Sequence, residues 1–237
     1  MNQNHEQQHA AAVASSSKLS RALIKLFSLP KSLYFNFKCL PFKSALKMPF
    51  LTSYRVKITK ARRNIVVFNC KPNRFMIRVG FDGSEGVVSR KGCICFEKGT
   101  VIFKGRALFC EGISLRSSGT LSFGENFITN KNCTIWCSMR IEFGRDVGLG
   151  WNSYIRDSDG DGHRIWINNE LNPTHKEIII GNHNWIGSEV HMLKGSGIGS
   201  DCVVGYKSLL TKRFTEDSVI IAGHPARIIH HNIRFIL

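Results

Sequence analysis

Aliphatic residues recur at every sixth position through the C-terminal part of the chain. The run comprises Ile180, Ile186, Met192, Ile198, Val204 and Leu210. A glycine directly follows four of these residues and allows a sharp turn that a side chain would crowd. Neither an α-helix nor a two-sided sheet has a period of six, whereas a flat strand followed by a corner does. Three such steps make one triangular coil of 18 residues, so the pattern predicts a parallel β-helix with the aliphatic side chains inside.

The same step is present upstream, but it is interrupted. Four residues keep it, namely Phe103, Phe109, Leu115 and Leu121. The equivalent pair Phe123 and Phe143 is 20 residues apart. Short apolar strands with adjoining glycines dominate from about residue 51 onward, so residues 51–237 are predicted to form one β-helical domain. Coils with bulges or one-residue insertions would explain the interruptions, and the sequence does not locate them.

The first 50 residues lack the six-residue period. Residues 1–17 are rich in Gln, Asn, His, Ala and Ser, which predicts a disordered tail. Residues 18–50 form a basic amphipathic extension, in which Pro30 is predicted to end a short helix. The apolar residues at helical spacing are Leu19, Ala22, Leu23, Leu26 and Phe27. The extension either lies on a membrane surface or packs against the body of the protein, and packing is the usual outcome.

Positive charge is concentrated in this part of the chain. The formal net charge is +16, and the stretch between Glu6 and Asp82 holds 15 of the 33 lysine and arginine residues with no acidic residue. Such a segment indicates an anionic partner, either lipid headgroups, an acidic polymer or nucleic acid, unless it is a solvated basic face. No nucleic-acid recognition motif accompanies the charge, so nucleic acid is not expected. Residues 18–63 are the predicted contact with an anionic membrane surface.

The cysteines and the N-terminus favour a cytoplasmic location. The eight cysteines have neither zinc-ribbon spacing nor the pattern of a disulfide framework, which favours reduced, mostly buried side chains. The apolar run Ala10–Ala14 is too short for a signal-peptide core, and no run approaches the roughly 18 apolar residues of a membrane-spanning helix. We therefore expect a cytoplasmic protein that contacts the inner face of the cytoplasmic membrane through its basic extension.

Three motifs interrupt or end the repeats. They are DSDGDGH at 157–163, IGNHNWIG at 180–187 and AGHPAR at 222–227. In this order and spacing, the chain from about residue 50 to 230 resembles the hexapeptide-repeat acyltransferases. It is most similar to the branch with galactoside, maltose and polysaccharide O-acetyltransferases. The resemblance implies a left-handed parallel β-helix, acetyl-CoA as acyl donor, a sugar or polysaccharide hydroxyl as acceptor, no metal, and a homotrimer with each site between neighbouring chains.

His163 is the predicted general base. It lies on a polar loop that breaks the repeat between Ile155 and Ile178. A sugar hydroxyl must lose its proton as it attacks, and imidazole suits that task near neutral pH. In the resembled family the equivalent histidine has this role. An aspartate, either Asp157, Asp159 or Asp161, would orient its ring.

Two other interpretations of the same loop remain. An exposed Asp-Gly turn is the structural alternative. A calcium loop would need a glutamate where Asn168 stands, so that interpretation is weak.

The resemblance also implies binding residues. The coenzyme set is Trp185, Gly187, Ser188, Gly205, Lys212, Arg213 and Arg227, and the acceptor set is Asn132 and Asp157. Trp185 would border the thioester unless it only packs at a corner, and the backbone N–H groups around the two glycines would contact the pantetheine arm or stabilise an oxyanion. The basic side chains would bind phosphates unless they are merely solvated. Tyr206 departs from the family, which has a small residue beside this channel.

Two other functions compete with acetyl transfer. A β-helical zinc carbonic anhydrase needs three converging histidines, and the candidates are His163, His175, His183 and His191. The ligand spacing of that family is absent. A non-enzymatic β-helical scaffold is the second alternative, because a fold alone does not establish an activity.

Overall fold

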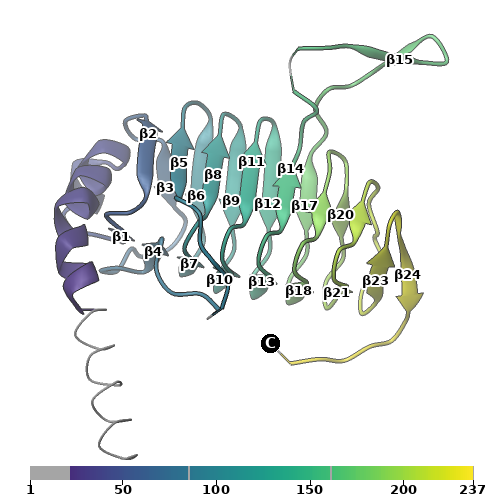
Figure 1. Cartoon of the computed structure of the whole chain (residues 1–237). Coiled ribbons are helices and arrows are strands. Elements are labelled where there is room, and N and C mark those ends of the chain that lie inside the picture. Colours follow the sequence, from purple (N-terminus) through teal and green to yellow (C-terminus); the bar gives the residue numbers. More distant parts are fainter. Residues whose placement is uncertain (1–21, 85, 161, 237) are drawn as a thin grey trace, which may run out of the picture.

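The computed structural model describes residues 22–84, 86–160 and 162–236. Its strands wind into a three-sided prism, a left-handed parallel β-helix, with helices covering the N-terminal end (Figure 1). The predicted fold is thus confirmed. The predicted disordered tail, residues 1–17, lies outside the described residues, as does Leu19.

Each side of the prism is one sheet. Sheet A has the order β1 (Phe50–Thr52), β4 (Ile77–Val79), β7 (Ala107–Phe109), β10 (Phe127–Thr129), β13 (Val147–Leu149), β18 (Asn184–Ile186), β21 (Val203–Val204), β23 (Ile220–Gly223) and β24 (Ala226–His230). Sheet B has β2 (Lys57–Ala61), β5 (Cys93–Phe96), β8 (Ser114–Ser117), β11 (Thr134–Cys137), β14 (Tyr154–Arg156), β19 (His191–Met192) and β22 (Leu209–Leu210). Sheet C has β3 (Val66–Phe68), β6 (Thr100–Phe103), β9 (Thr120–Phe123), β12 (Arg140–Phe143), β17 (Ile178–Ile180) and β20 (Gly197–Ile198). Neighbouring strands within these sheets run parallel, apart from the antiparallel pair β23–β24.

The six-residue period is confirmed as the interior of the prism. All six aliphatic residues of the run are buried. Residues 18 apart face each other between coils: Ile180 pairs with Ile198, Ile186 with Val204, and Met192 with Leu210. Each coil therefore contributes one strand and one inward aliphatic residue to each sheet. These residues stack in three columns.

The coils between Thr100 and Arg156 are regular, but each has 20 residues. Phe103 pairs with Phe123, and Phe123 pairs with Phe143. Their rings stack at centroid distances of 5.2 and 5.4 Å. Four-residue strands in sheets B and C, such as β8 and β9, accommodate the longer coil. The jump in the sequence period between Phe123 and Phe143 thus comes from two extra residues in the coil, and the pairing of these strands shows no bulge.

The N-terminal helix corrects the sequence prediction. Its described part covers residues 22–39 and continues through Pro30, which was expected to end it. Phe35 and Cys39 are buried against the first coil, and this packing outweighs the hydrogen bond that the proline removes. The predicted apolar stripe faces away from the body, because Leu23, Leu26 and Phe27 are exposed. A short helix, α2 (Phe42–Ala45), follows.

Polar side chains of this helix cover the open edge of sheet A. The backbone N–H groups of alternate residues of the edge segment donate to successive helix side chains: Phe50 to Asn36 Oδ1 (3.1 Å), Thr52 to Ser32 Oγ (2.8 Å) and Tyr54 to Ser28 Oγ (3.1 Å). The spacing matches, because four helical residues rise about 6 Å and two strand residues span about 6.6 Å. The helix thereby provides acceptors for the backbone N–H groups of an edge strand, which would otherwise be free to pair with another chain.

Candidate functional site

A long excursion leaves the prism at the corner between sheets B and C. It connects β14 to β17 and contains the antiparallel hairpin β15 (Ile165–Ile167) and β16 (Glu170–Asn172), which projects from the stack (Figure 1). The exposed His163 lies at the base of this hairpin. It lines a cavity of about 410 Å³ together with Arg164, Leu171, Asn172, Pro173, Thr174 and His175.

The first residue of the excursion holds the preceding coil. The Asp157 side chain is fully buried. Its carboxylate accepts hydrogen bonds from the backbone N–H groups of Ser138 (2.7 Å), Met139 (2.8 Å) and Arg140 (2.8 Å). One coil earlier, the equivalent N–H groups of residues 118 and 120 donate to backbone carbonyls of the next coil. Asp157 therefore replaces the ladder acceptors that the excursion removes, and it is not available to an acceptor sugar as we had expected.

The other two aspartates proposed to orient His163 are Asp159 and Asp161. The Asp159 carboxylate forms an ion pair with Lys194, whose Nζ also donates to the Pro173 carbonyl at 2.6 Å. This pair ties the start of the excursion to its end and to the next coil. Asp161 lies outside the described residues.

A larger cavity lies on sheet A, about 700 Å³ in volume. Its wall includes two tryptophans, Trp151 and Trp185, and the latter is 51% exposed on β18. Ser188 and Asn130 add polar groups to the same wall. Two indole rings beside hydroxyl and amide groups form a surface suited to an amphipathic ligand. Trp151 and Asn130 were not predicted from the sequence.

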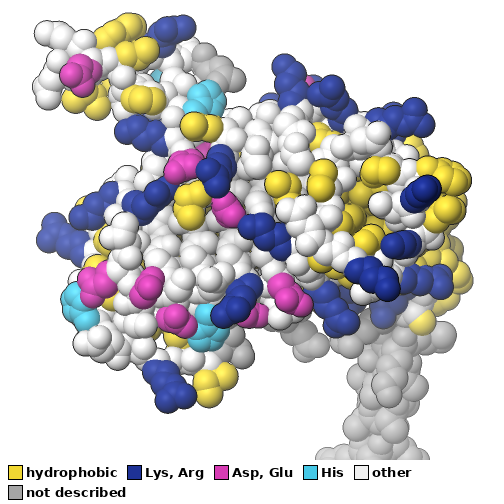
Figure 2. All heavy atoms as spheres, turned by 180° about the vertical axis from the view of Figure 1, so that it is seen from behind, with side chains coloured by type: hydrophobic (Ala, Val, Ile, Leu, Met, Phe, Trp, Pro, Cys, Tyr) yellow, Lys and Arg dark blue, Asp and Glu magenta, His cyan; other side chains and the backbone are white. Residues whose placement is uncertain are grey.

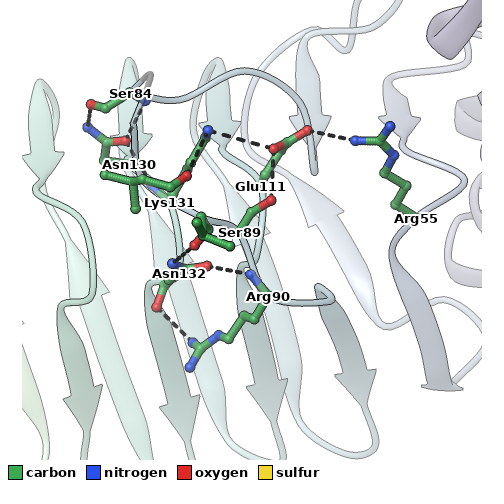
Figure 3. Close-up of polar contacts among 10 residues, drawn as sticks. Arg55, Ser84, Ser89, Arg90, Glu111, Asn130, Lys131 and Asn132 are labelled. Carbon is green, nitrogen blue, oxygen red and sulfur yellow. Dashed lines mark hydrogen bonds and ion pairs between the residues drawn. The ribbon is translucent and has the colours of Figure 1, made fainter.

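Gly83 and Ser84, on the loop that follows β4, line this cavity. The polar contacts of this loop are drawn in Figure 3. Ser84 N donates to Asn130 Oδ1 at 3.0 Å, and Asn130 Nδ2 donates back to Ser84 Oγ at 2.6 Å. The Asn132 amide is also engaged, because its Oδ1 accepts from Arg90 N (2.9 Å) and its Nδ2 donates to the Val88 carbonyl (2.8 Å). Asn132 thus fastens the loop, and its contact with an acceptor stays a prediction.

The predicted coenzyme residues divide between corners. Trp185, Gly187, Ser188 and Gly205 lie where sheet A turns into sheet B. The N–H groups of Gly187 and Gly205 donate to the carbonyls of Val204 and Ile221, both at 2.8 Å. These two amides are therefore used within the ladder, and an oxyanion contact of the N–H groups around them stays a prediction.

The basic residues of the set lie elsewhere. Arg213 bridges to Gly197 of β20 and forms an ion pair with Glu177 at 3.2 Å, which puts it at the same corner as the excursion. Lys212 is its neighbour, with Nζ 5.4 Å from the centre of the Phe214 ring. Arg227 is exposed on β24, at the C-terminal end of sheet A.

The Cys110 thiol is the nucleophile candidate beside the large cavity. It is buried, and desolvation raises its pKa to about 12. A thiol with this pKa stays protonated at neutral pH and is a poor nucleophile. All eight cysteines are free, and five of them are buried, in agreement with the sequence prediction.

The histidines of the zinc alternative do not converge. His175 Nδ1 lies 2.8 Å from Thr174 Oγ1 beside the excursion, whereas His183 Nδ1 lies 2.8 Å from Asp201 Oδ1 at the corner between sheets C and A. Within the described residues, no group of three His, Cys, Asp or Glu side chains is arranged to hold a metal ion.

The relatives found by comparison with known proteins are named as acetyltransferases. No protein-family model matches the chain. The galactoside O-acetyltransferase of Escherichia coli (strain K12) is 33% identical over 110 residues, which cover 46% of this chain and 53% of that protein. The putative lipopolysaccharide biosynthesis O-acetyl transferase WbbJ of the same organism is 29% identical over 133 residues, or 51% of this chain and 67% of that protein. The chain thus spans about half of the first relative and two thirds of the second.

A solved structure was also found to be similar. It is a galactoside acetyltransferase in complex with coenzyme A, with a TM-score of 0.41 and 21% sequence identity. The similarity covers 89% of this chain and 82% of that one.

Proposed function

We propose that this chain, a relative of the hexapeptide-repeat acetyltransferases, transfers an acetyl group from acetyl-CoA to a hydroxyl of a sugar or polysaccharide. The observation that carries the proposal is the position of His163. Its imidazole is exposed in a cavity at the base of a projecting hairpin, at the corner of the prism that also carries Lys212 and Arg213. A base at this position is accessible to a hydroxyl, and the nearby cations suit the phosphates of coenzyme A.

The proposed reaction is a direct transfer. His163 accepts the proton of the acceptor hydroxyl as the oxygen attacks the thioester carbonyl, which forms the new C–O bond. The tetrahedral intermediate then collapses, the C–S bond breaks, and the imidazolium returns the proton to the leaving thiolate. The protonated Cys110 supports this route over an acetyl-enzyme, because it offers no thiolate to acylate.

The division of the site between two corners supports a homotrimer. In one chain His163 and Trp185 line different cavities, on different corners of the prism. In a three-fold assembly, the corner between sheets B and C of one chain would face the corner between sheets A and B of its neighbour. Each complete site would then combine His163 of one chain with Trp185 of the next.

An acetyl-transfer screen tests the proposed activity. The full chain would be incubated with acetyl-CoA and three acceptor classes, namely simple glycosides, sugar nucleotides and lipid-linked oligosaccharides, and thiol release would be measured. We expect acceptor-dependent release of coenzyme A with at least one class. Coenzyme A binding by calorimetry without transfer to any class would favour the scaffold alternative, and absence of binding would contradict the proposal.

Mixed oligomers test the shared site. His163→Ala and Trp185→Arg are each expected to be inactive, and refolding them together in equal amounts should restore about a quarter of wild-type activity, because a random site then draws both wild-type residues one time in four. Each variant refolded alone is the control. Activity that stays at the level of the separate variants, or a fully active monomer in sedimentation, would contradict the shared site.

A further inference from the structure

The outer face of the N-terminal helices is apolar and exposed. Its residues, here called the helical face, are Leu23, Leu26, Phe27, Leu33, Tyr34, Phe37, Phe42 and Leu46. The largest exposures are those of Phe27, at 67%, and Phe42, at 68%. In the space-filling view, hydrophobic side chains gather over this end of the molecule with lysine and arginine side chains around them (Figure 2). A continuous exposed apolar area of this kind marks an interaction site.

The side chains of the helical face do not hold the helix on the prism. The inward side of the helix consists of the buried Phe35 and Cys39 and of three polar residues. The side chains of these three, Ser28, Ser32 and Asn36, are hydrogen-bonded to the edge of sheet A. The helix thus carries apolar residues on its outer face as well as on the face that packs on the core, whereas a surface helix usually has apolar residues only toward the core. The exposed apolar residues therefore have no role in the packing of the described part of the chain.

The positive charge around the helical face indicates what kind of partner it can bind. Lys25, Lys38, Lys43 and Lys47 are exposed on the same two helices or beside them. No acidic residue occurs between Glu6 and Asp82. A second copy of the chain docked face to face would oppose lysines with lysines and offer no carboxylate to pair with them. An anionic bilayer satisfies both features, because it has apolar chains beneath negative headgroups.

We propose that the helical face docks reversibly on the surface of an anionic lipid bilayer. The helix lies in the plane of the interface, its apolar side chains enter the boundary between headgroups and acyl chains, and the lysines contact lipid phosphates. Among the described residues no helix is both long and apolar enough to cross a bilayer. This proposal narrows the predicted contact from residues 18–63 to one face of the helices, and it does not depend on the proposed acetyl transfer.

Vesicle flotation of the full chain tests the proposal. The vesicles contain phosphatidylcholine with or without phosphatidylglycerol, at low ionic strength. Leu26→Glu/Phe27→Glu is expected to weaken binding to the anionic vesicles at least about ten-fold. The matched control is Val88→Glu/Ile229→Glu, which adds the same charge at residues that are 89% and 52% exposed outside the helical face, and it should bind like the wild type.

A second variant separates charge from apolar contact. Lys38→Glu/Lys43→Glu should lose binding to anionic vesicles, and added salt should do the same to the wild type. Unchanged flotation of Leu26→Glu/Phe27→Glu, with a circular dichroism spectrum like that of the wild type, would overturn the proposal. So would vesicle-free self-association of the full chain that this variant abolishes, because the face would then be an interface between copies.

Discussion

His163→Ala is expected to lower kcat for acetyl transfer by roughly 10²- to 10⁴-fold, the range typical for loss of a general base. The substitution removes the proposed proton acceptor without touching the large cavity, because His163 and Trp185 line separate cavities. The Kd for coenzyme A, measured by calorimetry, should therefore change little.

A matched histidine serves as control for this variant. His183→Ala removes an imidazole at another corner, where Nδ1 contacts Asp201, and should keep turnover near that of the wild type. Both variants would be assayed by thiol release at saturating acetyl-CoA. Wild-type turnover by His163→Ala, with coenzyme A binding intact, would show that another group takes the proton, and His183 or His191 would become the base to examine.

The fold was predictable from the sequence where the chain repeats itself. Every sixth side chain points inward and must be apolar, so the sequence itself shows the period. The buried pair Ile180 and Ile198 is an example. The 20-residue coils also place apolar side chains inward, but their strands are longer, so the spacing of these residues is not a constant six. The N-terminal helix was predicted less well. Its inward residues Ser32 and Asn36 are polar because they bind the backbone of an edge strand, which no hydrophobic pattern reveals.

The candidate site was predictable only in outline. The motifs located the excursion and Trp185, since both break or flank the repeat. Asp157 and Asn132 were assigned to the acceptor from the family resemblance, and the sequence does not distinguish a polar residue that binds a substrate from one that binds the backbone. The structure shows that both bind the chain itself. Trp151 lines the same cavity as Trp185 because the coils stack, which brings together residues distant in sequence.

Asp157→Ala is expected to destabilise the folded chain by roughly 3–5 kcal/mol, because it leaves three backbone N–H groups at residues 138–140 without their charged acceptor. The carboxylate is fully buried, so water does not readily replace it. For a chain of this size the loss corresponds to a fall in Tm of about 10 °C. Thermal unfolding followed by circular dichroism at fixed protein concentration measures it.

Asp159→Ala is the matched control, two residues further along the same excursion. Its carboxylate is partly exposed and forms an ion pair with Lys194, so its removal should cost no more than about 1 kcal/mol. Asp157→Asn is expected to lie near Asp157→Ala, because the amide group keeps one acceptor oxygen but turns a donor toward backbone donors. Equal melting of Asp157→Ala and Asp159→Ala would contradict the role of Asp157 as the substitute for missing ladder carbonyls. The larger loss at Asp157 would instead place the anchor of the excursion at its first residue, six positions before His163.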